Sequence, residues 1–164
     1  MNTSSTSGFV QSGGLTKAIF MAGLLAGTLD IIAACIQAYL VKSITPDRIL
    51  LYIATSLFGR DAYAGGISMI LVGLLIHYLI ATGWTTLFFL SYPKINFLTQ
   101  NKIVVGLLYG VFVWVMMNRV LVPLTRVATG PFKLSNALIG CAILMMCIGL
   151  PISIMAHRYY SDKH

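Results

Sequence analysis

Charged side chains are scarce in this sequence. Lysine, arginine, aspartate and glutamate make up 9% of the residues, whereas about a quarter of the residues of a soluble domain are charged. A chain with so little charge cannot cover a globular core with polar surface, which excludes a soluble globular domain. Only 4 residues are acidic, and Asp47, Asp61 and Asp162 lie outside the long apolar runs. A hydrolase that works with paired carboxylates is therefore not expected.

Metal-binding and catalytic motifs are also missing. Cys35, Cys141 and Cys147 lie in apolar runs without CxxC or Cys/His ligand spacing, so they are expected to pack as small apolar side chains. No GxSxG, HExxH, Walker A or dinucleotide-binding glycine pattern occurs in a suitable context. The sequence therefore predicts no metal, no cofactor and no catalytic residues, and an intramembrane enzyme ranks last among the functions considered.

The few charges that are present are mostly basic. The chain has 11 Lys and Arg residues and a net charge of +7. In so apolar a chain, this excess is typical of loops that face anionic lipid headgroups. No basic cluster is interleaved with aromatic residues, so nucleic-acid binding is not predicted. The expected partner is the lipid bilayer.

Long apolar runs dominate the sequence, which is 58% hydrophobic with a mean hydropathy of +0.88. Helices formed by these runs would be long enough to cross a bilayer core of about 30 Å. The runs are residues 18–41, 65–90, 103–124 and 134–156. The sequence predicts an all-α integral membrane bundle of four transmembrane helices, with its transmembrane domain at 17–157.

The two ends of the chain have a different composition. Residues 1–16 are rich in Ser, Thr and Gly and carry no charged side chain, which favours a disordered tail. Residues 158–164 form a polar C-terminal tail. The positive charges expected on the two sides of the membrane are equal in number. Both termini are assigned to the cytoplasm because Arg48 and Arg60, on the opposite side, are accompanied by acids.

A short helix is predicted between the first and second spans. Thr45-Pro46-Asp47 combines a cap, a proline at the first helical position and an acid in the first turn, and Gly59 can end the helix. An apolar stripe follows at helical spacing: Leu50, Ile53, Ala54 and Leu57. The segment is too short to cross a bilayer, so it is expected to lie in the interface or dip into the bundle.

The first span carries a continuous stripe of small and polar residues at helical spacing: Gly23, Gly27, Asp30, Ala34 and Gln37. Such a stripe is expected to face protein, with the apolar remainder facing lipid. Similar features recur in the next spans, where Gly73 shares a face with His77 and Gly106 forms a GxxxG pair with Gly110. The predicted helix-packing residues are Gly23, Gly27, Gly73, Gly106 and Gly110.

Polar residues inside the spans form the candidate site, a buried polar seam of Asp30, Gln37, His77 and Asn118. Ionisable groups within a membrane span are rare and usually face the protein interior or water. Asp30 and His77 lie near the middle of consecutive spans, so they are expected at similar depth and close together. The structural alternative is that these groups only hydrogen-bond helices to one another.

Two segments carry a family resemblance: LLAGTLDIIAACIQAYL in the first span and LLYGVFVWVMMNRVLVPL in the third. They resemble small bacterial inner-membrane proteins of the YagU type, a group whose naming is linked to acid resistance. The resemblance implies a bacterial plasma membrane and about four helices, and it assigns no catalytic residues. Two functions stay open: proton or small-solute passage along the polar seam, and a structural or accessory subunit that packs against a second copy or another membrane protein.

Overall fold

The computed structural model describes residues 7–127 and 133–161, with side chains from Gly14 onward. Within these residues all regular structure is helical and no strand is present. Four stretches are long and apolar enough to cross a membrane: Gly14–Lys42, Gly66–Lys94, Lys102–Leu124 and Leu134–Ser161. The prediction of an all-α protein with four helices able to span a membrane is confirmed.

The helices follow one another in a simple order. The first two spans contain the single helices α1 (Ser7–Lys42) and α3 (Gly66–Ser91), separated by α2 (Pro46–Phe58) and the 3-10 helix η1 (Gly59–Ala64). Two short 3-10 helices, η2 (Tyr92–Lys94) and η3 (Asn96–Thr99), lead from α3 to α4 (Lys102–Met116).

Each of the last two spans is interrupted by a π-helical turn. The turn η4 (Met117–Leu121) separates α4 from α5 (Val122–Leu124). The turn η5 (Met145–Gly149) separates α6 (Leu134–Leu144) from α7 (Leu150–Ser161). A π-turn carries an extra residue and shifts the faces of the helix that follows, and the sequence analysis does not predict these two.

The predicted tails are shorter than expected. Because α1 begins at Ser7, residues 7–16 are helical, and the prediction of a disordered tail is wrong for them. No proline interrupts this stretch, and extending an existing helix avoids the cost of a new nucleus. At the other end α7 continues to Ser161, past the predicted start of the C-terminal tail. The remaining tail residues, 1–6 and 162–164, lie outside the described residues.

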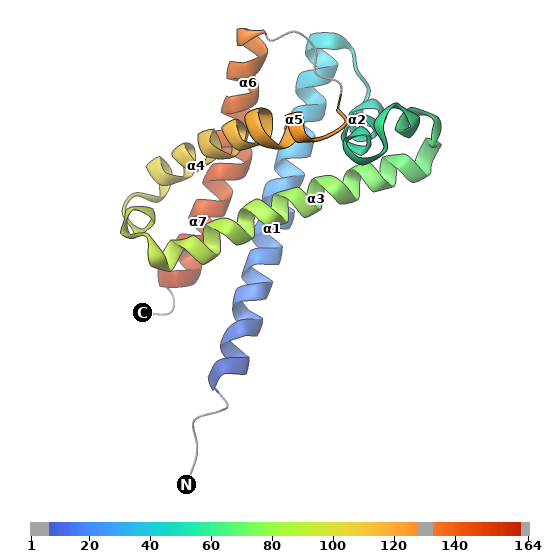
Figure 1. Ribbon diagram of the computed structural model, residues 1–164. Helices are drawn as coiled ribbons and strands as arrows, with labels where there is room; N and C mark the ends of the chain where they lie inside the picture. Colours follow the sequence, from blue (N-terminus) through green and yellow to red (C-terminus); the bar gives the residue numbers. More distant parts are fainter. Residues whose placement is uncertain (1–6, 128–132, 162–164) are drawn as a thin grey trace.

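Helix α1 is the centre of the arrangement. It contacts α3 on one side and α6, η5 and α7 on the other. Figure 1 shows α1 standing beside the α6–α7 helix, with α3 and α4 drawn across them. The buried core lies where these helices meet: Ala22, Ala26, Phe88, Phe89, Tyr92, Val105, Val113, Ile148, Ile152 and Ala156.

The predicted short helix is present as α2. Pro46 is at its first turn, and Gly59 ends it with a φ of 63°, a left-handed value that favours glycine. Its buried face differs from the predicted stripe, because Thr55 is buried while Leu57 is exposed. The hydroxyl of Thr55 donates to the carbonyl oxygen of Tyr52 at 2.6 Å, which satisfies its hydrogen-bonding group and lets it pack against α3.

Candidate functional site

Two glycines bring α1 and α3 into close contact near the middle of the two candidate spans. A Cβ on Gly23 would lie 3.0 Å from Oγ1 and 3.1 Å from Cα of Thr82. A Cβ on Gly27 would lie 3.0 Å from Cδ1 of Tyr78 and 3.1 Å from Cβ of Ala81. Both glycines are buried. The absence of a side chain on this face of α1 is what allows α3 to approach its backbone.

The close approach puts His77 of α3 within reach of the α1 backbone. Its Nε2 atom lies 2.8 Å from the carbonyl oxygen of Gly27. A carbonyl oxygen can only accept a hydrogen bond, so Nε2 must carry the hydrogen. In the neutral ring, Nδ1 is therefore the acceptor nitrogen. This hydrogen bond fixes both the tautomer and the position of the ring.

Asp30 lies one helical turn beyond Gly27 and is half-buried. Its carboxyl group interacts electrostatically with His77 of α3. It also interacts with the thiol of Cys147, which comes from η5 in the fourth span. Asp30 thus lies where α1 meets both α3 and η5. Direct contact between Asp30 and His77 stays a prediction, and Cys147 was expected only to pack as a small apolar side chain.

A second interhelical hydrogen bond lies next to this pair. Oγ1 of Thr28 and the phenol oxygen of Tyr78 are 2.8 Å apart. Thr28 already donates its only hydroxyl hydrogen to the carbonyl oxygen of Leu24, at 2.7 Å. Tyr78 is therefore the donor in the bond between the two helices. The sequence analysis missed this pair, because Thr28 and Tyr78 lie beside the glycine stripe and not on it.

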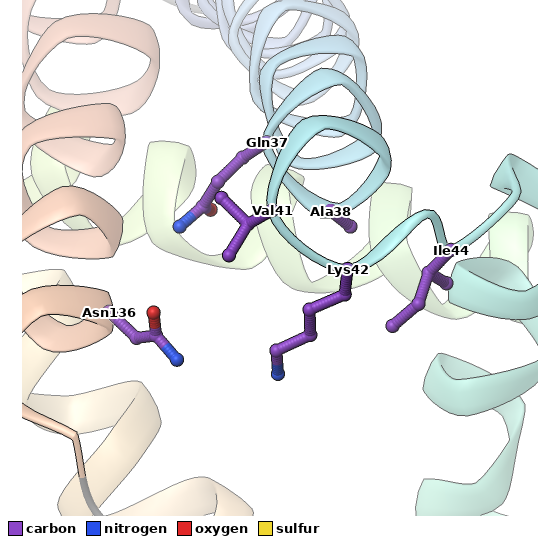
Figure 2. Close-up of a pocket in the computed structure, with 6 residues that line it drawn as sticks. All are labelled: Gln37, Ala38, Val41, Lys42, Ile44 and Asn136. Atoms are coloured by element: carbon purple, nitrogen blue, oxygen red, sulfur yellow. The ribbon is translucent and has the colours of Figure 1, made fainter.

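Gln37 lies two helical turns beyond Asp30, beside a small hollow between α1 and α6. The hollow has a volume of about 150 Å³ and is lined by Gln37, Ala38, Val41, Lys42, Ile44 and Asn136. Figure 2 shows the side chains of Gln37 and Asn136 extending toward this space from the two helices. The space can hold several water molecules, with amide groups present to bind them. Asn136 was not among the predicted site residues.

Asn118 lies apart from the other predicted polar residues. It is exposed on the π-turn η4, and its side-chain amide donates to the carbonyl oxygen of Trp114 at 2.9 Å. This hydrogen bond stays within its own span and does not join Asn118 to Asp30, Gln37 or His77. The polar groups that the structure brings together are therefore Asp30 and His77, with Gln37 further along the same helix.

The other end of the α1–α3 contact is filled by aromatic side chains. Phe88 and Phe89 are buried there, and hydrogen bonds made by two tyrosines join α3 and η2 to α7. Tyr160 donates to the carbonyl oxygen of Phe89 at 2.9 Å, and the hydroxyl of Tyr92 lies 2.8 Å from Nδ1 of His157. The hollow beside Gln37 thus lies toward the C-terminal end of α1, and packed side chains lie toward its N-terminal end.

The three remaining predicted glycines also lie against other helices. A Cβ on Gly73 would meet the backbone of Leu50 in α2, and one on Gly110 would meet the backbone of Met145 in η5. A Cβ on Gly106 would lie 3.0 Å from the carbonyl oxygen of Gly149. Gly149, which the sequence analysis did not single out, completes a glycine contact between the third and fourth spans.

Within residues 7–127 and 133–161, no group of three or more His, Cys, Asp or Glu side chains is arranged to hold a metal ion. Comparison with models of protein families, with curated proteins and with solved structures found no match to the chain. The resemblance to the YagU type therefore stays a prediction.

Proposed function

We propose that this protein passes protons across a bacterial plasma membrane, and that Asp30 and His77 are the groups that carry the proton. The observation that supports this most strongly is the pairing of two ionisable side chains from different helices near the middle of their spans. Ionisable groups at this depth are costly, and proton relays are among the functions that retain them.

The chemistry of the pair suits proton exchange. The hydrogen bond from Nε2 of His77 to Gly27 holds the ring and leaves Nδ1 as its acceptor nitrogen. A carboxylate and a neutral imidazole can share one proton, which passes between them directly or through a water molecule. Asp30 can receive the proton from water and pass it to Nδ1, or the reverse.

The route to the pair follows the small-residue face of α1. Gln37 lies about 10 Å along the helix from Asp30, and Ala34 lies between them on the same face. The hollow at Gln37 and Asn136 provides polar groups and room for water at the end of this face. In the proposed state, protons reach Asp30 from this side of the membrane. We assign this side to the outside of the cell, with both termini in the cytoplasm.

The packed aromatic side chains toward the N-terminal end of α1 hold the other side closed. Phe88 and Phe89 are 1% and 0% exposed, so packed side chains fill this end of the contact. Release of the proton to the cytoplasm therefore requires α3 to move relative to α1.

The proposal is tested by proton flux into liposomes that contain the purified protein, a potassium gradient with valinomycin, and an internal pH-sensitive dye. The wild type should acidify the lumen faster than protein-free liposomes, and Asp30→Asn should reduce the rate to the protein-free value. Asp47→Asn is the matched control, since Asp47 is exposed at the start of α2. It should leave the flux unchanged.

Wild-type protein that conducts no better than protein-free liposomes would contradict proton passage. Asp30→Asn protein that conducts like the wild type would contradict the role of the pair. In the first case the accessory-subunit function becomes the better account. That function predicts that Asp30→Asn lowers the amount of folded protein in the membrane.

A further inference from the structure

A second, larger hollow lies next to the first at the C-terminal turns of α1, between α1 and α2. Its volume is about 890 Å³, within the range of pockets that hold small molecules. It is lined by Ala34, Ala38, Lys42, Ser43, Ile44, Thr45, Arg48, Ile49, Tyr52 and Tyr63. It lies where the first span ends, at the depth at which a bilayer changes from hydrocarbon to headgroups.

The charge of this hollow is positive. Its described lining residues include the cations Lys42 and Arg48 and no carboxylate. The turn between α1 and α2 brings the two cations to the same hollow, with Ser43 in a left-handed conformation at a φ of 52°. The first turn of α2 lies here too. The positive end of its helix dipole adds to the potential, and the exposed carboxylate of Asp47 in that turn, which does not line the hollow, lowers it. The hollow is therefore complementary to an anion.

Two tyrosines supply neutral hydrogen-bond donors beside the cations. Burial raises the pKa of the Tyr52 phenol above its usual value, and the neighbouring Tyr63 phenol raises it further. Tyr52 consequently keeps its hydroxyl hydrogen at physiological pH and can donate it to an anionic oxygen. Tyrosine is also the residue type that membrane proteins place at the headgroup level.

The remaining lining is apolar. Ala34 and Ala38 lie along α1 toward the membrane centre, and Ile44 and Ile49 flank the turn and the first part of α2. Small side chains on one wall and branched ones on the other leave an apolar path that continues from the cationic mouth into the hydrocarbon region. A soluble anion such as phosphate would leave this path unfilled, whereas a lipid has both a headgroup and a chain to fill it.

We propose that the hollow between α1 and α2 binds one anionic phospholipid, with its phosphodiester group at Lys42 and Arg48 and an acyl chain along Ala34 and Ala38. The lipid site does not rest on the proposed proton passage, although its hollow shares Ala38, Lys42 and Ile44 with the hollow beside Gln37. Basic pockets between membrane helices bind anionic headgroups by this combination of charge and hydrogen bonding.

Native mass spectrometry of the full-length protein tests the proposal, with phosphatidylglycerol and phosphatidylcholine of the same acyl chains as probes. The wild type should retain one phosphatidylglycerol in preference to phosphatidylcholine. Removing one cation, as Arg48→Gln, should weaken phosphatidylglycerol binding about fivefold. Arg60→Gln is the matched control, because Arg60 is exposed on η1 and does not line the hollow. Arg48→Lys, which keeps the charge, should retain most of the binding.

Two results would overturn the lipid site. One is equal retention of phosphatidylglycerol by Arg48→Gln and Arg60→Gln, with both variants as thermally stable as the wild type. The other is displacement of the bound lipid by millimolar inorganic phosphate or glycerol 3-phosphate, which would make the hollow a site for a soluble anion. If Arg48→Gln is thermally unstable, Lys42→Gln takes its place, with Lys94→Gln as its control. Weaker phosphatidylglycerol binding by Lys42→Gln than by Lys94→Gln supports the site, and equal retention by both overturns it.

Discussion

The imidazole of His77 is bonded to the backbone of α1, with its Nε2 atom 2.8 Å from the carbonyl oxygen of Gly27. This contact joins the second span to the first one helical turn before Asp30. It depends on a position without a side chain, because the α3 surface lies where a Cβ of residue 27 would be. The packing of α1 against α3 and the position of His77 thus both depend on Gly27.

Replacement of Gly27 by leucine is expected to separate α1 from α3. A Cβ at this position already lies 3.0 Å from Tyr78, and the rest of the side chain has no space. The stability loss should be about 1–3 kcal/mol, the usual cost of overpacking. Gly83→Leu is the control, since a Cβ there meets nothing within 4 Å. Thermal unfolding in detergent measures both, and equal midpoints for the two variants would contradict the packing.

The contact between the third and fourth spans should be sensitive to a single methyl group. A Cβ on Gly110 would meet the backbone of Met145, which cannot move without the whole of η5. Gly110→Ala is expected to cost about 1–3 kcal/mol. At Gly140 a Cβ would lie 3.4 Å from Nε1 of Trp114, an ordinary contact, so Gly140→Ala should be neutral or stabilising. A Gly110→Ala protein as stable as Gly140→Ala would show that α4 and η5 are further apart than described.

Two substitutions at His77 should separate its structural and its chemical roles. Glutamine can still donate a hydrogen bond to the Gly27 carbonyl but cannot titrate, so His77→Gln should keep most of the stability and lose the proton flux. His77→Leu loses the hydrogen bond as well, at a cost of about 0.5–1.5 kcal/mol. Unfolding in detergent and flux in liposomes measure the two effects. Full flux from His77→Gln would remove His77 from the route.

The turn after α1 is expected to reject β-branched residues. Ser43 has a φ of 52°, and the amide of Ile44 donates back to the carbonyl oxygen of Ala38 at 3.2 Å. A left-handed conformation costs an L-residue about 1–2 kcal/mol and a β-branched residue more. Ser43→Val should therefore unfold at a lower temperature than Ser43→Gly. The opposite order would mean that the turn has another conformation.

The spans and the glycine stripes could be predicted from the sequence because both follow from short-range spacing. A run of apolar residues fixes the length of a helix. Gly23, Gly27 and Asp30 are four and three residues apart, which places them on one face of an α-helix. The short helix after Thr45 could likewise be predicted, from Pro46 at its start and Gly59 at its end. The start of α1 at Ser7 could not be predicted, because the glycines and serines of this stretch disfavour a helix on their own.

The neighbours of Asp30 across the bundle could not be predicted from spacing. Cys147 belongs to a span whose residues are almost all apolar, and the π-turn η5 alters which of its residues face α1. Asn118 illustrates the converse. It follows Gly110 by eight residues, which rotates it by about 80° from the glycine face of α4. Asn118 was predicted in the polar seam only because its side chain is polar. Its exposed position in the structure agrees with its rotation away from the glycine face.

The central claim is that water reaches the face of Asp30 from the C-terminal end of α1 and from no other side. Labelling of single cysteines in a cysteine-free protein, with a membrane-impermeant thiol reagent added to either side of sealed vesicles, measures this directly. Gln37→Cys should react from one side only, and Ala26→Cys, at a position that is 0% exposed, should react from neither until the protein is unfolded. A residue 37 cysteine that reacts from neither side, or a residue 26 cysteine that reacts as fast in the folded protein, would contradict the account.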